Sequence, residues 1–325
     1  MILSPRSIVI ASSALTLSLS ATAAIDTPSR AVVKSDGTVS TYRLLPVHLD
    51  PSHKTAVAAR LQALSAHHPT LPDQHQIAAN VTPAVRDQGE RGTCAYFATV
   101  GVLESYYLAQ SPKNKDISLS EECLVDVRNW MSDQGSNYTG SDQPSLRPDP
   151  NGDLPNSIIL TITKSGVPAA TRYSSTLDCT YDGNNTNGGD VALTDYVATV
   201  STDPNASLPY GKGLNFSQNV APTIDDIKTL LANDIPVEVG IVVYNEYMNG
   251  VDWRFDPAND NDSNVAGGHA ILLTGYSTAN AKTIFTFRNS WGTSWGNSGF
   301  GTIDDAILTN SWSVAPSLDF IVSLH

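Results

Sequence analysis

The feature that most constrains this chain is one cysteine, Cys94, which follows a glycine-rich approach and precedes a helical run. Only two histidines come after it, His269 and the C-terminal His325. A thiol that acts as a nucleophile needs a base, and that base needs a group to orient it. His269 and Asn289 supply both in chain order, so catalysis would require a fold that joins these three positions. The alternatives are a buried core thiol for Cys94 and a structural role for His269.

Helical patterns come early in the chain and strand patterns come late. Apolar and aromatic residues at helical spacing predict a helix over residues 95–109, with Cys94 at its N-terminus. Further helices are expected at 55–64, from 118 or 120, at 158–164 and at 223–233, and strands at 237–243, 270–276 and 283–288. This order predicts an α+β protein with two lobes.

Four motifs stand out along the chain: Gln88–Cys94, Leu119–Asp126, Gly268–Ala270 and the run from Asn289 to Gly301. Together they resemble the motifs of the papain family of cysteine peptidases. The resemblance extends from about Leu71 nearly to the C-terminus. It implies a helical lobe over about 85–200 and an antiparallel, β-barrel-like lobe over about 201–325. The active site is then expected in the cleft between the two lobes.

The resemblance assigns a role to each residue of the expected site. Cys94 would attack as a thiolate, whose pKa a helix N-terminus and an adjacent imidazolium both lower. His269 would pair with it and then protonate the leaving amine. Asn289 would accept the N–H of the far ring nitrogen, and Trp291 would shield that bond from water. Trp291 is also expected among the substrate-binding residues. Gln88 and the Cys94 backbone N–H would form the oxyanion hole. The alternatives are a turn Asn289 beside a core tryptophan and a surface Gln88.

The resemblance also indicates a substrate pocket. The pocket for the side chain one residue before the scissile residue would be lined by Pro155, Gly240, Gly268 and Ala270. All four are small or apolar, which favours a hydrophobic side chain there. Asp153 stands where the family usually has glycine, and it would narrow the cleft or bring negative charge beside it.

The first 23 residues read as a secretory signal peptide. Arg6 precedes a short apolar run, and residues 21–23 form a small-x-small cleavage site. A membrane anchor is the alternative, but the run is too short and too rich in Ser, Thr and Ala to span a bilayer. We therefore expect a secreted or periplasmic protein with no membrane association after signal removal. Residues 24–70 would form a propeptide or a flexible leader, and 71–325 the catalytic domain.

The chain contains three cysteines, an odd number for a secreted protein. The catalytic interpretation keeps Cys94 reduced, and the resemblance implies a disulfide between Cys123 and Cys179. The first cysteine of the family's bridge normally falls at the position of Val127, one helical turn after Cys123. Two buried thiols are the alternative.

The net charge of −13 and the pI near 4.7 argue against nucleic acid and anionic membranes as partners. Residues 256–264 are rich in Asp and Asn but lack the glycine and terminal glutamate of a calcium loop, so a solvated loop and no metal are expected. The expected partners are peptide or protein substrates, the expected state is a monomer, and no cofactor is needed.

Together these patterns predict a secreted cysteine endopeptidase that works through an acyl-enzyme. A peptide ligase that uses the same acyl-enzyme remains an alternative. A papain-fold binding or adhesion protein with reduced activity is another, which the Asp153 change and the unusual leader keep open. A transglutaminase-like enzyme would need an acidic third member in place of Asn289.

Overall fold

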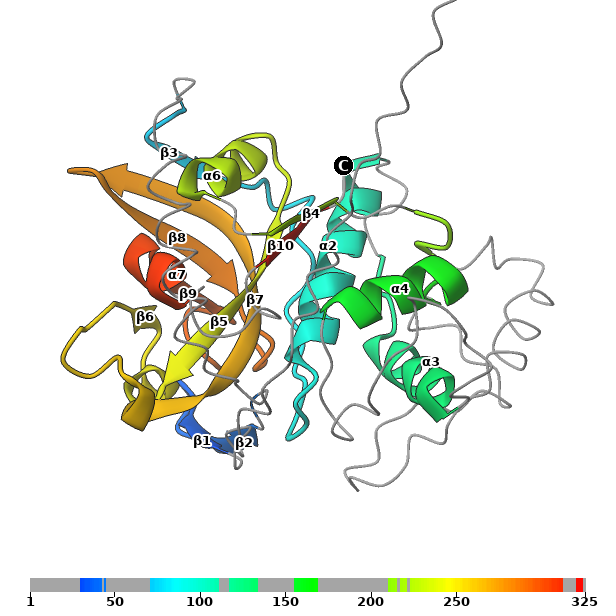
Figure 1. Ribbon diagram of the computed structural model, residues 1–325, viewed down its shortest axis with the longest axis horizontal. Helices are drawn as coiled ribbons and strands as arrows, with labels where there is room; N and C mark the ends of the chain where they lie inside the picture. The colour runs from blue at the N-terminus through cyan, green and yellow to red at the C-terminus, as the bar shows by residue number, and fades with distance from the viewer. Residues whose placement is uncertain are drawn as a thin grey trace, which may run out of the picture.

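The computed structural model of the chain describes residues 30–42, 44, 71–110, 117–133, 155–168, 210–214, 217–220, 223–311 and 320–323. Three helices, α2 (Cys94–Gln110), α3 (Glu121–Asp133) and α4 (Pro155–Ser165), lie on one side of the molecule, and most strands lie on the other (Figure 1). This confirms the α+β arrangement expected from the sequence. The helix expected over 55–64 falls outside the described residues.

The strands form one large sheet. They are β3 (Gln74–Gln76), β4 (Ser217–Val220), β5 (Val237–Tyr244), β6 (Asp252–Trp253), β7 (Val265–Ala279), β8 (Lys282–Arg288), β9 (Phe300–Asp304) and β10 (Phe320–Ser323). Their order is β4–β10–β5–β7–β8–β9–β6, and β3 also pairs with β7. The pairs are antiparallel except for β6–β9, which is parallel. In the described part of the chain this sheet does not close into a barrel, and its mostly antiparallel pairing agrees with the expected lobe.

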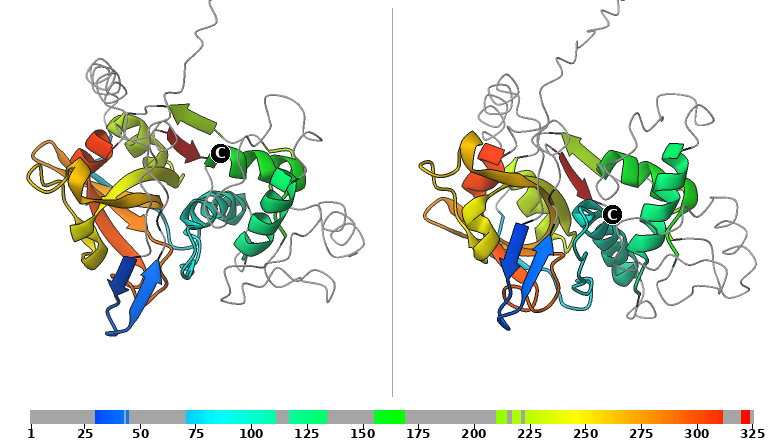
Figure 2. Two further views of the ribbon diagram at one scale, coloured as in Figure 1. Left: turned by 60° about the horizontal axis from the view of Figure 1, so that its bottom comes forward. Right: turned by 90° about the horizontal axis from the view of Figure 1, so that it is seen from below.

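Short elements complete the sheet lobe. They are α6 (Ile224–Ala232), α7 (Asp305–Ser311) and the 3-10 helices η3 (Asn245–Asn249) and η4 (Asp262–Asn264). Thr223 caps α6 with a reciprocal pair of bonds: its hydroxyl accepts from the Asp226 N–H, and the Asp226 carboxylate accepts from the Thr223 N–H. This capping box confirms the helix start that the sequence indicated. A hairpin of β1 (Arg30–Val33) and β2 (Val39–Tyr42) lies at the lower edge of the lobe in Figures 1 and 2.

Helix α2 is the central element of the molecule. Its residues from Cys94 to Ser105 are all buried, as expected for a helix that has neighbours on every side. It packs against the helices α3 and α4 and against β7 of the sheet. The N-terminus of α2 therefore lies at the boundary between the two groups of elements.

Strand β7 joins two apolar cores. Ala270 and Leu272 belong to the core of the helical side, whereas Ile271 and Leu273 belong to the core of the sheet. This follows from the alternation of side chains along a strand. His269 is the fifth residue of β7, so this strand carries it to the same boundary that Cys94 occupies.

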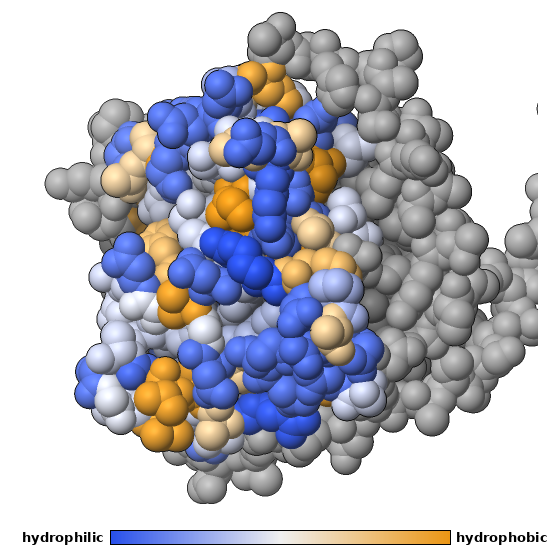
Figure 3. Space-filling model, turned by 90° about the vertical axis from the view of Figure 1, so that its left-hand side faces the viewer, coloured by the Kyte–Doolittle hydropathy of each residue, from blue (hydrophilic) through white to orange (hydrophobic). Residues whose placement is uncertain are grey.

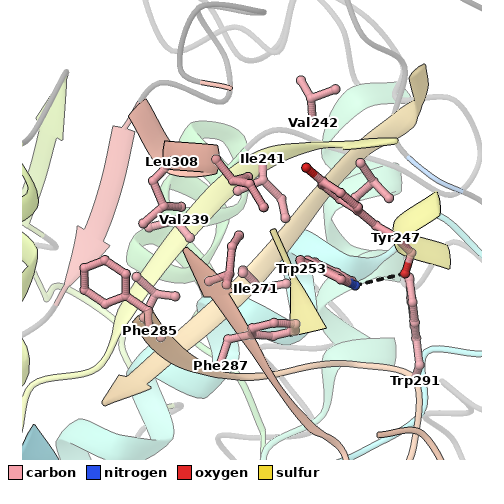
Figure 4. Close-up of a cluster of buried hydrophobic side chains, with 14 of the residues drawn as sticks. Val239, Ile241, Val242, Tyr247, Trp253, Ile271, Phe285, Phe287, Trp291 and Leu308 are labelled. Atoms are coloured by element: carbon pink, nitrogen blue, oxygen red, sulfur yellow. Dashed lines mark hydrogen bonds between the residues drawn. The ribbon is translucent and has the colours of Figure 1, made fainter. Parts of the chain in front are cut away.

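The sheet core contains a cluster of aromatic rings (Figure 4). Trp253 stacks on Tyr247 with ring centroids 5.8 Å apart, and its indole N–H donates to the Tyr247 carbonyl at 2.9 Å. Its ring also lies 4.7 Å from that of Phe287 and 6.2 Å from that of Trp291. Burial of rings this large contributes strongly to stability, and the cluster supports Trp291 from the core side.

The surface on the sheet side is largely polar, and its apolar residues lie in separate small groups (Figure 3). Among the described residues, the exposed large hydrophobic side chains are Val33, Val39 and Val251. In the part of the chain that the structure describes, helices capable of crossing a membrane were not found.

Candidate active site

Cys94 is the first residue of α2. The Thr93 carbonyl accepts the Tyr96 N–H at 2.9 Å and so begins the helix, whose dipole favours negative charge at this end. The thiol is free and fully buried, and its Sγ lies 3.4 Å from the donating backbone N–H of Ala270. Burial raises the pKa of the Cys94 thiol to about 12, while the N–H groups of Ala270 and Ala95 oppose that rise. In this covered state the group is a thiol.

His269 is held by Asn289. Its Nε2 lies 2.8 Å from the side-chain oxygen of Asn289, which can only accept, so Nε2 carries the proton. Among the described residues, the buried Nδ1 has no hydrogen-bond partner. Burial lowers the pKa of His269 to about 4, and the bond to Asn289 opposes that shift. The neutral ring therefore presents Nδ1 as the atom that can take a proton.

Asn289 lies directly after β8, and local contacts fix its orientation. Its backbone N–H donates to the Gly299 carbonyl at 2.9 Å, and its side-chain oxygen also accepts the Ser290 N–H at 2.8 Å. Trp291 stacks on the His269 ring with centroids 4.9 Å apart and planes 28° apart. The His269–Asn289 bond is thus both constrained and screened from water, which strengthens it.

Gln88 is buried, and its amide is oriented by three contacts. The Ser290 hydroxyl donates to its Oε1 at 2.5 Å, its backbone N–H donates to the Ser290 carbonyl, and its Nε2 donates to the Arg91 carbonyl at 2.6 Å. Because Ser290 also contacts Asn289, one residue links the two amides. Gln88 is therefore a fixed interior group and does not lie at the surface.

Most of the expected pocket residues lie on two paired strands. Gly240 of β5 and Ala270 of β7 are direct register partners, and Gly268 pairs with Val242. Pro155 is the first residue of α4, while Asp153 lies outside the described residues. Two small residues thus face each other beside the Ala270 N–H that contacts Sγ.

The expected disulfide remains a prediction. Cys123 is buried in the first turn of α3. The Ser120 hydroxyl caps this helix by accepting the Cys123 N–H at 3.1 Å. Cys179 lies outside the described residues.

A cluster of buried charges, which the sequence motifs did not reveal, holds the site's elements together. Arg86 reaches the carboxylates of Glu104 on α2 and Glu121 on α3, each at 2.7 Å. Arg288, at the end of β8, donates to the carbonyls of Ala84 and Phe97 at 2.7 Å each. The segment that carries Gln88, the helix that carries Cys94 and the strand before Asn289 are thus tied together.

Glu238 is a second residue that the motifs missed. It is a buried acid on β5, and its Oε2 lies 2.8 Å from the hydroxyl of Thr99 on α2. Thr99 has one hydroxyl proton, which it can donate to the Ala95 carbonyl, also at 2.8 Å. The contact between Thr99 and Glu238 is then satisfied when a protonated Glu238 donates to the Thr99 hydroxyl oxygen. Burial raises the pKa of Glu238 to about 8 and so favours that form. A lone charge within the apolar run 237–243 was the available signal.

Known proteins similar to this chain were found by sequence and by structure. The family model described as papain family cysteine protease matches residues 69–314. A pro-cathepsin H from Medicago truncatula is 27% identical over 77% of this chain and 63% of its own length. The chain covers 51% to 63% of the first three curated relatives. Xylellain, a cysteine protease from Xylella fastidiosa, has a TM-score of 0.53 at 21% identity, covering 91% of this chain and 98% of its own. A digestive procathepsin L 3 of Tenebrio molitor has a TM-score of 0.53 at 19% identity, covering 80% and 72%.

Proposed function

This chain belongs to the papain family of cysteine proteases, and we propose that it hydrolyses peptide bonds with Cys94 as the nucleophile. One observation carries the proposal: the thiol at the N-terminus of a buried helix lies beside β7, where His269 is bound to Asn289 at 2.8 Å. A nucleophile, a base and an orienting group are the three parts that such chemistry needs.

The proposed reaction begins with transfer of the Cys94 proton to Nδ1 of His269. The thiolate attacks the peptide carbonyl, and the oxyanion is held by the Cys94 N–H and by the second hydrogen of the Gln88 Nε2. As the C–N bond breaks, His269 returns its proton to the leaving amine, which leaves a thioester on Cys94. Water then attacks that thioester, gives a proton to His269 and releases the acid, and the thiol recovers its own proton.

We propose that this chain is a latent form; two of the similar proteins are named as pro-forms, a pro-cathepsin H and a procathepsin L 3. The supporting observation is that both Cys94 and His269 have no exposed surface. The burial that would keep a substrate out also keeps the thiol and the imidazole neutral. Exposure of the site would lower the pKa of Cys94 and raise that of His269, because water stabilises both charged forms. Opening of the site would therefore admit the substrate and at the same time favour the ion pair of Cys94 and His269.

The remaining features of the proposal come from the sequence. Residues 1–23 would direct export, part of 24–70 would act in latency, and Cys123 would pair with Cys179 outside the cell. The partners would be peptide or protein substrates, acted on by a monomer without a cofactor.

Hydrolysis of a casein-like fluorogenic substrate by the purified, reduced protein tests the proposal. It is measured before and after incubation at acidic pH, with and without a thiol-directed epoxide. We expect turnover that the epoxide abolishes and that Cys94→Ser lacks. Added amine nucleophiles reveal ligase activity by the appearance of new amide products. A folded wild-type protein that binds the substrate without cleaving it in any of these conditions would favour the binding-protein alternative.

A further inference from the structure

The hairpin of β1 and β2 is bound to the loop that carries the catalytic amide. Tyr42, at the end of β2, is fully buried and stacks on Trp291 with ring centroids 5.0 Å apart and planes 22° apart. Its hydroxyl donates toward the Trp291 carbonyl at 3.0 Å and lies 3.2 Å from both carboxylate oxygens of Asp87. Burial raises the pKa of Tyr42 to about 12, so the hydroxyl keeps the proton that it donates.

Trp291 stacks on both Tyr42 and His269. The centroid separations are 5.0 Å and 4.9 Å, and both pairs of planes are close to parallel. A displacement of Tyr42 would therefore move Trp291, and with it the imidazole of His269. The same indole also contacts Trp295 edge-on, with ring centroids 5.5 Å apart, on the side of the sheet core. The hairpin therefore supports Trp291 through the Tyr42 stack, and the sheet core supports it through Trp295.

The turn of the hairpin is fixed by two further contacts. Lys34 forms an ion pair with Asp87 at 2.7 Å, and the Asp87 backbone bridges to that of Trp291. The N–H and the hydroxyl of Ser35 both donate to the Ser294 carbonyl, at 2.7 Å and 2.6 Å. Figure 2 shows the hairpin beside this loop in both views.

The hairpin also belongs to the apolar core of the sheet lobe. Val32, Tyr42 and Leu44 are fully buried in the cluster that contains Trp253 and Trp291. The strands expose Val33 and Val39 to solvent, so the apolar inner face and the exposed outer face are clearly separated. Loss of the hairpin would uncover the Trp291 ring and admit water toward the His269–Asn289 bond.

We propose that the hairpin of residues 30–42 is a retained part of the active enzyme, in which Tyr42 is a positioning residue that holds Trp291 against His269. This rests on the proposed peptidase function. It divides the region expected to be a propeptide or leader: the hairpin stays bound after activation, whether or not the chain is cut between it and residue 71. Hydrogen bonds join it to Asp87, Trp291 and Ser294, and the ring of Tyr42 contacts that of Trp291, which in turn contacts His269.

The first test identifies what the active enzyme contains. A biotinylated thiol-directed epoxide captures the active species under native conditions, and the captured protein is digested and mapped. We expect peptides from residues 30–42 at the same molar amount as the labelled Cys94 peptide. Capture of labelled Cys94 without the hairpin overturns the proposal.

The second test measures the role of Tyr42 by the pH profile of kcat/KM. In Tyr42→Ala we expect a loss of about tenfold or more, because a displaced catalytic group can cost up to ~10²-fold. The alkaline limb, which reports loss of the imidazolium, moves to higher pH, because water that reaches the ring relieves the burial that lowers the pKa of His269, and this outweighs the weakened bond to Asn289. Tyr42→Phe keeps the stack and should keep the limb close to its wild-type position. Val39→Ala, on the exposed face of the same hairpin, is the matched control and should change neither value.

Three outcomes contradict the positioning role. A rise in kcat/KM in Tyr42→Ala would identify the hairpin as inhibitory. An unchanged pH profile in Tyr42→Ala would show that Tyr42 has only a structural role. A Tyr42→Phe profile equal to that of Tyr42→Ala would show that the ring stack does not position His269. If the wild type cleaves no peptide, the proposed function fails separately. The hairpin is then tested by the pH dependence of iodoacetamide alkylation at Cys94, compared between wild type and Tyr42→Phe, Tyr42→Ala and Val39→Ala.

Discussion

The side-chain oxygen of Asn289 lies 2.8 Å from Nε2 of His269, and it joins the loop after β8 to the fifth residue of β7. The contact is buried and is covered by Trp291. It fixes which ring nitrogen carries the proton, so the other nitrogen, Nδ1, is left for proton transfer. The proposed roles, an amide that orients and an imidazole that transfers protons, rest on this geometry.

We expect Asn289→Ala to impair kcat/KM less than His269→Ala. The amide orients the ring, whereas the imidazole moves the protons, and general acid–base catalysis is worth about 10²–10⁴-fold. Steady-state kinetics on the two folded variants, with circular dichroism to establish folding, give the comparison. The reverse ranking would contradict the assigned roles.

Glu238→Gln is expected to stabilise the protein at neutral pH but not in acid. The pKa of Glu238 is raised from 4.5 to about 8 by burial, so the folded state keeps a proton that the unfolded state loses as pH rises above 4.5. Wild-type stability therefore falls between pH 4.5 and 8, and each pKa unit is worth about 1.4 kcal/mol. The variant should be more stable by up to about 3 kcal/mol at pH 7 and by little at pH 4.

Urea denaturation at both pH values measures this difference. Glu90→Gln, on an exposed residue, is the matched control. A variant that gains the same stability at pH 4 as at pH 7, or loses stability at pH 7, would show that Glu238 is not held protonated by burial.

Arg86→Met should strongly destabilise the fold, because it leaves the buried carboxylates of Glu104 and Glu121 without their shared partner. Removal of one member of a buried ion pair costs about 3–5 kcal/mol. Arg254→Met, whose ion pair with Asp252 lies at the surface, serves as the comparison and should cost less than about 1 kcal/mol. If thermal and urea unfolding show equal losses of stability in Arg86→Met and Arg254→Met, the buried cluster has no special role in stability.

Substrate preference is expected to be hydrophobic at the residue before the scissile residue. Gly240 and Ala270 face each other across β5 and β7, and burial of a Leu, Phe or Tyr side chain there would gain about 1.5–3 kcal/mol. Glu238, two residues from Gly240, leaves this preference unchanged while it is protonated, below about pH 8. A positional-scanning peptide library measures the preference. Dominant cleavage after Arg-x or Lys-x pairs, abolished by Asp153→Gly, would instead assign selection to the carboxylate of Asp153.

Sequence patterns predicted the elements that hold the candidate site. Helical spacing indicated 95–109, and the observed helix is Cys94–Gln110; the strand expected at 237–243 is Val237–Tyr244. Local patterns suffice here because each element is a largely apolar run that is buried over most of its length. The strand expected at 270–276 extends over Val265–Ala279, because pairing with β5 continues through the two glycines before His269. Tertiary pairing overrode the breaking tendency of those glycines.

Other parts of the site depend on contacts between distant segments, which periodicity does not report. The stack of Tyr42 on Trp291 joins residues 249 positions apart in the chain, and the Arg86 cluster joins two helices to a loop. Nothing in the local sequence around Tyr42 predicts that its ring contacts the catalytic loop. The place of β6 in the sheet likewise depends on its parallel pairing with β9, between residues about 50 positions apart.

The most direct test of the account is to trap the acyl-enzyme. The activated, reduced protein is mixed with a p-nitrophenyl ester of a hydrophobic peptide, quenched in acid during turnover and mapped by mass spectrometry. The account predicts one acyl group per active protein, carried on Sγ of Cys94, and no turnover by Cys94→Ser. An acyl group on any other residue, or full turnover by Cys94→Ser, would contradict it.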